Sequence, residues 1–334
     1  MEGNFLIITL IVIFALAFDF INGFHDTANS IATSVSTKAL KPRHAIVLAA
    51  IMNFLGAMTF TGVAKTITKD IVDPFSLPNG TLVILAALIA AITWNLITWY
   101  FGIPSSSSHA LIGSVAGAAI ASADFGVLNY HGFINIIEAL IFSPIIAFAV
   151  GYLVYSLFKV IFKNYNLAKT NRNFRYFQIL TAAIQSYTHG TNDAQKTMGI
   201  ITMALMTGNY ISGGDVPFWV QAACATAMGL GTSVGGWRII KTVGSKIMKI
   251  RPVNGVAADL TGATVIFGAT FLHLPVSTTH VISSAILGVG SAHRIRGVKW
   301  DTAQRMIITW FITLPISAIL AFMCFRVLHF ILGF

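Results

Sequence analysis

The 334-residue chain has few charged residues: Asp, Glu, Lys and Arg make up only 10%, and only 11 residues are acidic. A surface in contact with water needs more charge than this, which excludes an ordinary soluble domain. Cysteine is also scarce. Cys224 and Cys324 lie in separate apolar runs, which favours two unpaired core residues over a disulfide or a metal site. The absence of a His-Glu-x-x-His segment excludes that class of metalloprotease.

Apolar residues dominate instead, at 56% of the chain with a mean hydropathy of +0.78. The runs 45–64, 81–103, 133–158, 217–236 and 306–325 each reach the ~20 residues that a helix needs to cross a bilayer. They lack the alternation of barrel strands, so they predict an all-α integral membrane protein. Because Glu2 replaces a basic start and no cleavage site follows, we expect residues 5–18 to remain as half of a first helix.

Two polar segments each occur twice, in the same order. Gly-Phe-His-Asp-Thr-Ala-Asn at 23–29 aligns with Gly-Thr-Asn-Asp-Ala-Gln-Lys at 190–196, at an offset of 167. Pro-Ser-Ser-Ser-Ser-His at 104–109 aligns with Pro-Val-Ser-Thr-Thr-His at 275–280, at an offset of 171. The chain is therefore predicted to hold an N-terminal repeat at 1–162, a linker at 163–175 and a C-terminal repeat at 176–334.

The net charge of +10 is placed unevenly, and the placement points to a membrane rather than to nucleic acid. If each copy has the same order of helices, parity places seventeen Lys and Arg residues on one side and only Lys65, Lys69 and Arg326 on the other. The positive-inside rule then makes the crowded side, with the linker, cytoplasmic and both termini extracytoplasmic. Each copy crosses an odd number of times, so the second is inverted, as in secondary transporters.

The serine- and threonine-rich segments are predicted to be the tips of re-entrant helical hairpins. The apolar arms that follow them, 110–123 and 281–292, are short for a full crossing. A proline ends the incoming helix and the hydroxyl cluster caps the outgoing one, so each tip aims backbone N–H groups and hydroxyls at the protein centre. Such tips form an anion cradle without a basic side chain, although helix capping alone would also explain the serines.

The Gly-x-x-Asp segments supply the opposite charge. Asp26 and Asp193 interrupt apolar segments, where an ionised carboxylate costs about 2.5–3.5 kcal/mol unless it is compensated. A bound alkali cation would compensate it, with neighbouring amides and, where glycine unwinds a helix, backbone carbonyls as further oxygen ligands. The alternative is an aspartate bonded to a neighbouring helix for folding only. Asp19, Glu138 and Asp259 are further acids in apolar surroundings without a matching acid in the other copy.

Lys196 stands where the first copy has Asn29. At membrane depth its ammonium needs a carboxylate or an anionic ligand nearby. Pairing with an acid on an adjacent helix, attraction of the substrate and a proton-linked role are all open.

These four motifs resemble the inorganic phosphate transporter family (PiT), whose Gly-Ala-Asn-Asp-type signature occurs once in each half. The match is at Gly23, Asp26 and Asn29, and again at Gly190 and 192–193. The chain departs from the signature at His25 and at the Gln-Lys pair 195–196. The resemblance covers nearly the whole chain and implies secondary uptake of inorganic phosphate, driven by sodium or protons, with two inverted repeats, each having a broken helix, full spans and a re-entrant hairpin, and no covalent catalysis.

On this resemblance we expect a phosphate importer in the cell membrane, coupled to sodium. The phosphate ligands would be Ser106, Ser107, Ser108, Ser277, Thr278 and Thr279, and the sodium ligands Asn22, Asp26, Asn29, Asn192, Asp193 and Gln195. No cofactor is expected beyond sodium as the coupling ion. Membrane lipid surrounds such a protein, and a homodimer through lipid-facing helices is common for the design. Proton-coupled symport of phosphate or metal-phosphate, or transport of another oxyanion such as sulfate, remains open.

Two other classes of function fit the sequence less well. An intramembrane serine protease would use a Ser-His pair such as Ser108 and His109, but it gives no reason to duplicate the cluster or the aspartate. A passive anion channel could use the same cradle but would have little use for paired aspartates.

Overall fold

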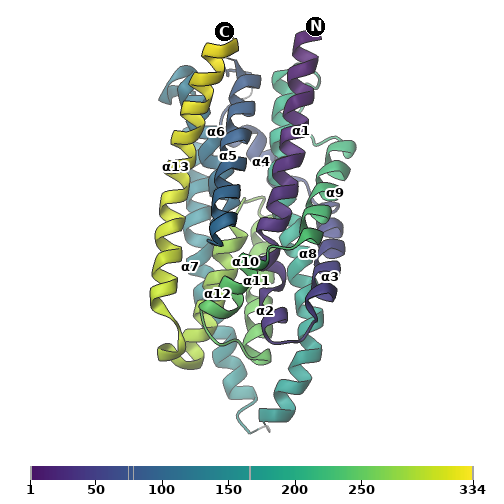
Figure 1. Ribbon diagram of the computed structural model, residues 1–334, viewed down its shortest axis with the longest axis vertical. Helices are drawn as coiled ribbons and strands as arrows, with labels where there is room; N and C mark the ends of the chain where they lie inside the picture. Colours follow the sequence, from purple (N-terminus) through teal and green to yellow (C-terminus); the bar gives the residue numbers. More distant parts are fainter. Residues whose placement is uncertain (1, 74, 78, 165–166, 333–334) are drawn as a thin grey trace.

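The structure is a computed structural model that describes residues 2–73, 75–77, 79–164 and 167–332. Within these ranges the regular elements are all helices, as the composition predicts. The longer helices run along one axis of the molecule, and both termini lie at the same end of it (Figure 1).

The order of helices in the first half recurs in the second. The first half holds α1 (Glu2–His25), α2 (Thr27–Ser36), α3 (Pro42–Ala57), α4 (Gly62–Asp70), α5 (Gly80–Phe101), α6 (Ser107–Ala123), the short turn η1 (Phe125–Val127) and α7 (Tyr130–Ile161). The second half holds α8 (Leu167–Thr207), α9 (Phe218–Val234), α10 (Trp237–Lys241), η2 (Thr242–Lys246), α11 (Pro252–Phe271), α12 (Thr278–Arg294), η3 (Ile295–Gly297) and α13 (Trp300–Leu332). Figure 1 shows α1 and α8 running in opposite directions.

Several helices are long and apolar enough to cross a membrane. By length and composition they are Phe5–Ser36, Gly80–Phe101, Tyr130–Ile161 and Trp300–Leu332, and the pair α3 and α4, bent by 68°, makes a fifth if counted as one span. The chain is therefore a multi-pass membrane protein by its helices.

The prediction of a broken helix in each copy is wrong for the second copy. α1 gives way to α2 at Asp26, whereas α8 is one helix of 41 residues through the whole Gly-x-x-Asp segment. Gly190 is there for close packing: a Cβ on it would lie 2.2 Å from the Asn53 carbonyl oxygen of α3. Gly23 likewise lies against α9, where a Cβ would come within 2.5 Å of the Met228 carbonyl oxygen. α8 also begins at Leu167, so most of the expected linker is helical.

Helices of the first half pack directly against helices of the second half. α6 of the first half packs on α13 of the second, and α12 of the second half packs on α7 of the first. Two glycines at matching positions make these contacts close: a Cβ on Gly117 would lie 2.1 Å from the Ala318 carbonyl oxygen, and one on Gly288 would lie 2.1 Å from that of Phe148. Each of the two main apolar clusters is accordingly built from both halves.

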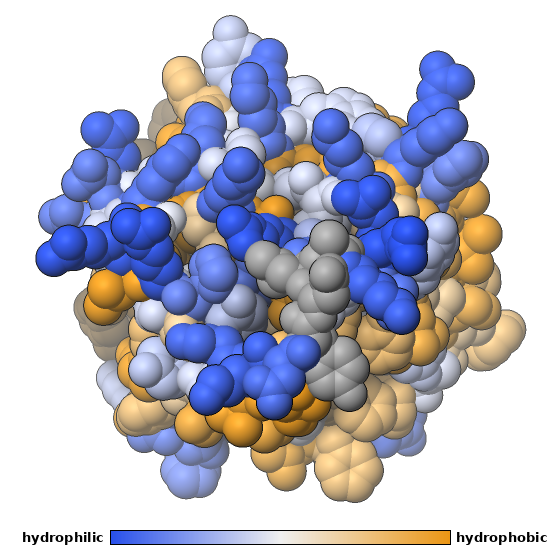
Figure 2. Space-filling model, turned by 90° about the horizontal axis from the view of Figure 1, so that it is seen from below, coloured by the Kyte–Doolittle hydropathy of each residue, from blue (hydrophilic) through white to orange (hydrophobic). Residues whose placement is uncertain are grey.

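The end of the molecule opposite the termini is strongly hydrophilic. Seen from below, this end carries many hydrophilic residues, and hydrophobic residues lie around its edge (Figure 2). Exposed basic residues in the connections between helices include Lys38, Lys41, Lys163 and Arg251, and the exposed Arg294 is the last residue of α12. Cys224 is buried, Cys324 is partly buried, and both are free thiols, as expected from the sequence.

Candidate functional site

The two hydroxyl-rich tips start helices near the centre of the molecule. Ser106 caps α6, accepting a hydrogen bond from the His109 backbone N–H at 3.1 Å, and Ser277 caps α12 in the same way at 3.3 Å from His280 N. The capping predicted from the sequence is thus present in both copies. Helix geometry leaves the first N–H groups of α6 and α12 without intrahelical partners, so each tip presents a partial positive charge.

The tips lie side by side through their last residues. The rings of His109 and His280 are 4.5 Å apart between centroids, and His280 stacks on Trp310 of α13 at 4.2 Å. The Ser108 hydroxyl of the first tip donates to the Val276 carbonyl of the second at 3.1 Å. Segments 168 residues apart are therefore held at one place.

Each tip donates a hydroxyl to the aspartate of its own copy, and the two contacts correspond. Ser107 Oγ donates to Asp26 Oδ2 at 2.6 Å, and Thr278 Oγ1 donates to Asp193 Oδ2 at 2.9 Å. Ser107 and Thr278 are themselves separated by the offset of 171 that relates the two tips. The structure thus brings the two motif types together, which the sequence alone could not show.

A second set of contacts crosses between the copies. Asn29 Nδ2 of the first copy donates to Thr279 Oγ1 at 2.9 Å and to Thr278 Oγ1 at 3.2 Å, both in the second tip. Thr279 Oγ1 also lies 3.4 Å from Asp26 Oδ1. All these side chains are at most 3% exposed, so the centre is shielded from bulk solvent.

The surroundings of Asp26 leave acceptor oxygens without donors. His25 Nδ1 lies 2.6 Å from Asp26 Oδ1, and its Nε2 lies 3.1 Å from Thr98 Oγ1. Asn22 Oδ1 and Asn29 Oδ1 are buried and have no hydrogen-bond partner among the described residues. A carboxylate with unpartnered amide oxygens nearby favours a bound cation over a purely structural role.

Asp193 is surrounded differently, because Lys196 contacts it directly. The Lys196 ammonium donates to Asp193 Oδ1, to Ser108 Oγ at 2.6 Å and to the Val276 carbonyl at 2.8 Å. Both partners of this ion pair are buried. The sequence left open a pairing of Lys196 with an acid on an adjacent helix. The partner in the structure is instead Asp193, three residues earlier on the same helix.

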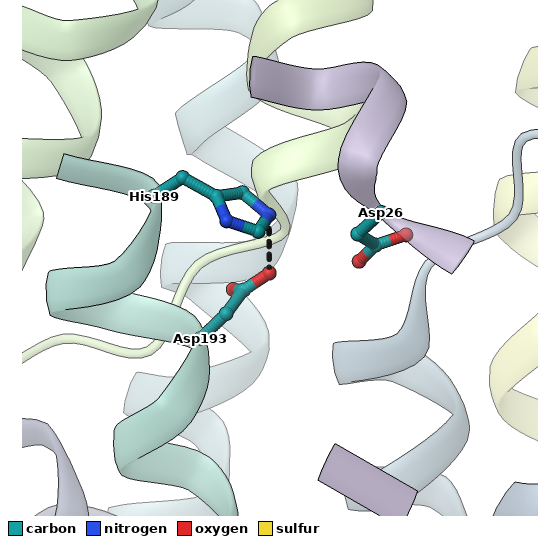
Figure 3. Close-up of side chains that lie close together, drawn as sticks. All are labelled: Asp26, His189 and Asp193. Carbon is teal, nitrogen blue, oxygen red and sulfur yellow. Dashed lines mark ion pairs between the residues drawn. The ribbon is translucent and has the colours of Figure 1, made fainter. Parts of the chain in front are cut away.

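His189 is a site residue that sequence reasoning missed. Its Nε2 lies 3.0 Å from Asp193 Oδ2, and its Nδ1 lies 3.0 Å from Asn53 Oδ1 on α3. Figure 3 shows His189 beside Asp193, with Asp26 facing them from the neighbouring helix. One ligand atom from each of these three residues falls within 4.8 Å of the others, so the cluster could hold a small cation. The signal available in the sequence was the position of His189, one helical turn before Asp193.

Asn192 and Gln195 have hydrogen-bond partners other than the two aspartates. The Asn192 amide donates to Thr270 Oγ1 at 3.1 Å and accepts from the Val276 backbone N–H at 3.2 Å. Gln195 accepts from the Ala64 backbone N–H at 3.2 Å and so binds α8 to α4. Their assignment as sodium ligands stays a prediction, and these contacts favour a role in positioning the second tip and α8.

The three other acids that the sequence places in apolar surroundings, Asp19, Glu138 and Asp259, lie in different environments. Asp259 accepts from Thr33 at 2.6 Å and from Thr181 at 3.0 Å, which explains its burial by hydroxyl bonding. Glu138 is exposed on α7. Asp19 is fully buried, and neither carboxyl oxygen has a hydrogen-bond partner among the described residues.

Comparison with known proteins identifies the family. The sequence profile of the phosphate transporter family matches residues 22–321. The chain belongs to this family. A probable low-affinity inorganic phosphate transporter of Bacillus subtilis (strain 168) is 76% identical over 96% of this chain and 97% of its own length. A probable low-affinity inorganic phosphate transporter of Rhizobium meliloti (strain 1021) is 45% identical over 96% of each chain.

A solved structure has the same fold. It is described as the sodium-dependent phosphate transporter and matches with a TM-score of 0.85 at 25% identity, over 97% of this chain and 99% of that one. The resemblance found in the four sequence motifs is thus confirmed for the family. The family is one of transporters, which are not an enzyme class.

Proposed function

We propose that this member of the phosphate transporter family imports inorganic phosphate by symport with sodium. The observation that carries the proposal is the convergence of two anion-attracting helix tips on two buried aspartates. A solved relative described as sodium-dependent supports the choice of ion. Transport in the cell membrane, with no cofactor beyond the coupling ion, follows from the same assignment.

Phosphate lies between the tips in this proposal. Backbone N–H groups at the starts of α6 and α12 and the hydroxyls of Ser107, Ser108, Thr278 and Thr279 bind its oxygens. Ser106 and Ser277, which we also assign to the phosphate site, act through the caps that fix the first turn of each helix.

Sodium lies at Asp26, with the side-chain oxygens of Asn22 and Asn29 as further ligands. This ion couples to phosphate through the tip hydroxyls. Ser107 and Thr279 now direct their hydroxyls at Asp26, at 2.6 and 3.4 Å. When sodium takes the carboxylate oxygens, these hydroxyls become free to donate to phosphate, so sodium binding strengthens phosphate binding and the reverse.

The membrane orientation follows from the charged end of the molecule. The hydrophilic end opposite the termini is cytoplasmic and both termini are extracytoplasmic, because lysine and arginine concentrate in cytoplasmic connections. The matching order of helices and the opposite directions of α1 and α8 support inverted repeats with re-entrant hairpins.

Proton coupling is the second candidate, and one contact favours it. His25 Nδ1 lies 2.6 Å from Asp26 Oδ1, and histidine can change its charge near neutral pH. A proton on this pair would neutralise Asp26 as sodium does. The same site would then drive phosphate uptake from a pH gradient.

Uptake of labelled phosphate into proteoliposomes decides between the two ions. Wild-type protein is measured with an imposed sodium gradient, an imposed pH gradient, and neither. The proposal expects concentrative uptake with sodium alone. Accumulation that follows only the pH gradient would replace sodium by protons, and equilibration without either gradient would make the protein a passive channel.

A further inference from the structure

Two positions that correspond in the repeat carry different groups. Asn29 and Lys196 both stand three residues after the aspartate of the motif, at the offset of 167. Asn29 brings a neutral amide to the second tip, and its Oδ1 has no partner among the described residues. Lys196 brings a full positive charge to the equivalent place.

The ammonium of Lys196 has the surroundings of a bound metal cation. Its three contacts are a carboxylate oxygen of Asp193, the Ser108 hydroxyl at 2.6 Å and the Val276 carbonyl at 2.8 Å. These are the oxygen types that hard cations bind. The two non-carboxylate oxygens come one from each tip, so the ammonium lies where the tips meet.

The ammonium of Lys196 is held in place by these contacts. Lys196 is 2% exposed, as buried as the tip hydroxyls around it. Its long side chain is folded back on Asp193, three residues away on the same helix. A charge that is covalently attached cannot be released on the other side of the membrane. Lys196 therefore neutralises Asp193 but does not couple phosphate transport to the ion gradient.

We infer that Lys196 is a tethered cation that occupies the second coupling-ion position, so that this centre exchanges one sodium ion, at Asp26, instead of two. The inference rests on the proposed function for the sodium ion at Asp26. The neutralisation of Asp193 by Lys196 does not depend on that function. It makes residue 196 the determinant of how many cations bind at the centre. An amide there, as at Asn29, would open the second position.

Sodium binding to purified protein tests this directly. Radiolabelled sodium at saturation is counted per protein for wild type, Lys196→Asn, Lys196→Arg and the exposed control Lys249→Asn. We expect one ion for wild type, Lys196→Arg and Lys249→Asn, and two for Lys196→Asn. Adding Asp193→Asn to Lys196→Asn should remove the gained ion.

Thermal unfolding gives a second readout that does not depend on transport. In choline chloride, Lys196→Asn should melt below wild type because Asp193 loses its partner, and sodium should raise its melting temperature more than that of Lys249→Asn. If Lys196→Asn is too unstable to purify, Lys196→Gln is measured in the same way.

The outcomes separate this inference from the proposed function. If wild type binds no sodium and Lys196→Asn binds one, sodium at Asp26 is wrong while the tethered cation stands. If folded Lys196→Asn binds no more sodium than wild type and gains no extra thermal stability from it, Lys196 does not occupy a cation position and the inference is overturned. Two ions bound to wild type would overturn it as well.

Discussion

The two copies of the aspartate motif fold differently although their sequences align. In the first copy α1 ends and α2 begins at Asp26, within the span Phe5–Ser36, and the carboxylate faces hydroxyls, a histidine and unpartnered amide oxygens. In the second copy α8 is continuous, and Asp193 already has the Lys196 ammonium. The hydroxyl tips, by contrast, kept the same caps and the same hydroxyl-to-aspartate bond. The two copies thus share their helix caps and the hydroxyl that contacts the aspartate, and they differ in the other groups around the aspartates.

Asp193→Asn should have the largest effect on folding. It leaves the Lys196 ammonium buried without its partner, and breaking a buried ion pair costs about 3–5 kcal/mol. Denaturant or thermal unfolding of detergent-purified protein measures the loss. Wild-type stability in this variant would mean that the two aspartates are equivalent after all.

Asp26→Asn should instead lose the ion and keep the fold. Removing the charge that binds sodium should weaken sodium binding and abolish sodium-driven uptake, because an amide oxygen carries no charge to compensate the ion. Stability should fall less than in Asp193→Asn, because no buried lysine loses its partner. Sodium-dependent uptake at the wild-type level would remove the proposed site from Asp26.

Gly23→Ala and Gly190→Ala test a feature that the copies share. A Cβ would meet backbone oxygens at 2.5 Å and 2.2 Å, so each substitution should cost about 1–3 kcal/mol by overpacking. Gly268→Ala is the control, because nothing lies within 4 Å of its added Cβ. Equal stability of all three variants would show that the motif glycines are not needed for helix packing.

Lys65→Asn should have the smallest effect, although Lys65 also pairs with an aspartate. The Lys65 and Asp215 side chains are 52% and 88% exposed, and the hydrogen bond from Lys65 holds the pKa of Asp215 below its ordinary value. Exposed ion pairs contribute little to stability. The melting temperature and phosphate uptake should match wild type, in contrast with substitutions in the buried pair.

The sequence predicts the architecture better than the details of the ion site. Apolar runs and matching offsets indicate membrane helices and duplicated tips, because both signals are read directly from the order of residues along the chain. The prediction failed where distant contacts decide the conformation. Gly190 packs on α3 instead of unwinding α8, and nothing near it in sequence indicates that.

The sequence also did not predict which partners the side chains around the two aspartates contact. Asn192 and Gln195 neighbour Asp193 in sequence but bind the second tip and α4, while His189, one turn earlier, contacts Asp193. Which face of α8 each residue occupies relative to the tips depends on the packing of several helices. The contact of Ser107 with Asp26, 81 residues apart, depends on the same packing.

The claim that two tips share one anion is tested most directly by phosphate affinity in a double-mutant cycle. Ser107→Ala and Thr278→Ala are measured alone and together, with thermal stability recorded on the same preparations. Each single change should weaken phosphate binding by roughly 1.5–3 kcal/mol, the usual contribution of a hydrogen bond to a charged group. The double variant should be non-additive, because both groups bind one ligand. Unchanged affinity in both single variants, with only a loss of stability, would contradict the account and leave the tips as helix caps.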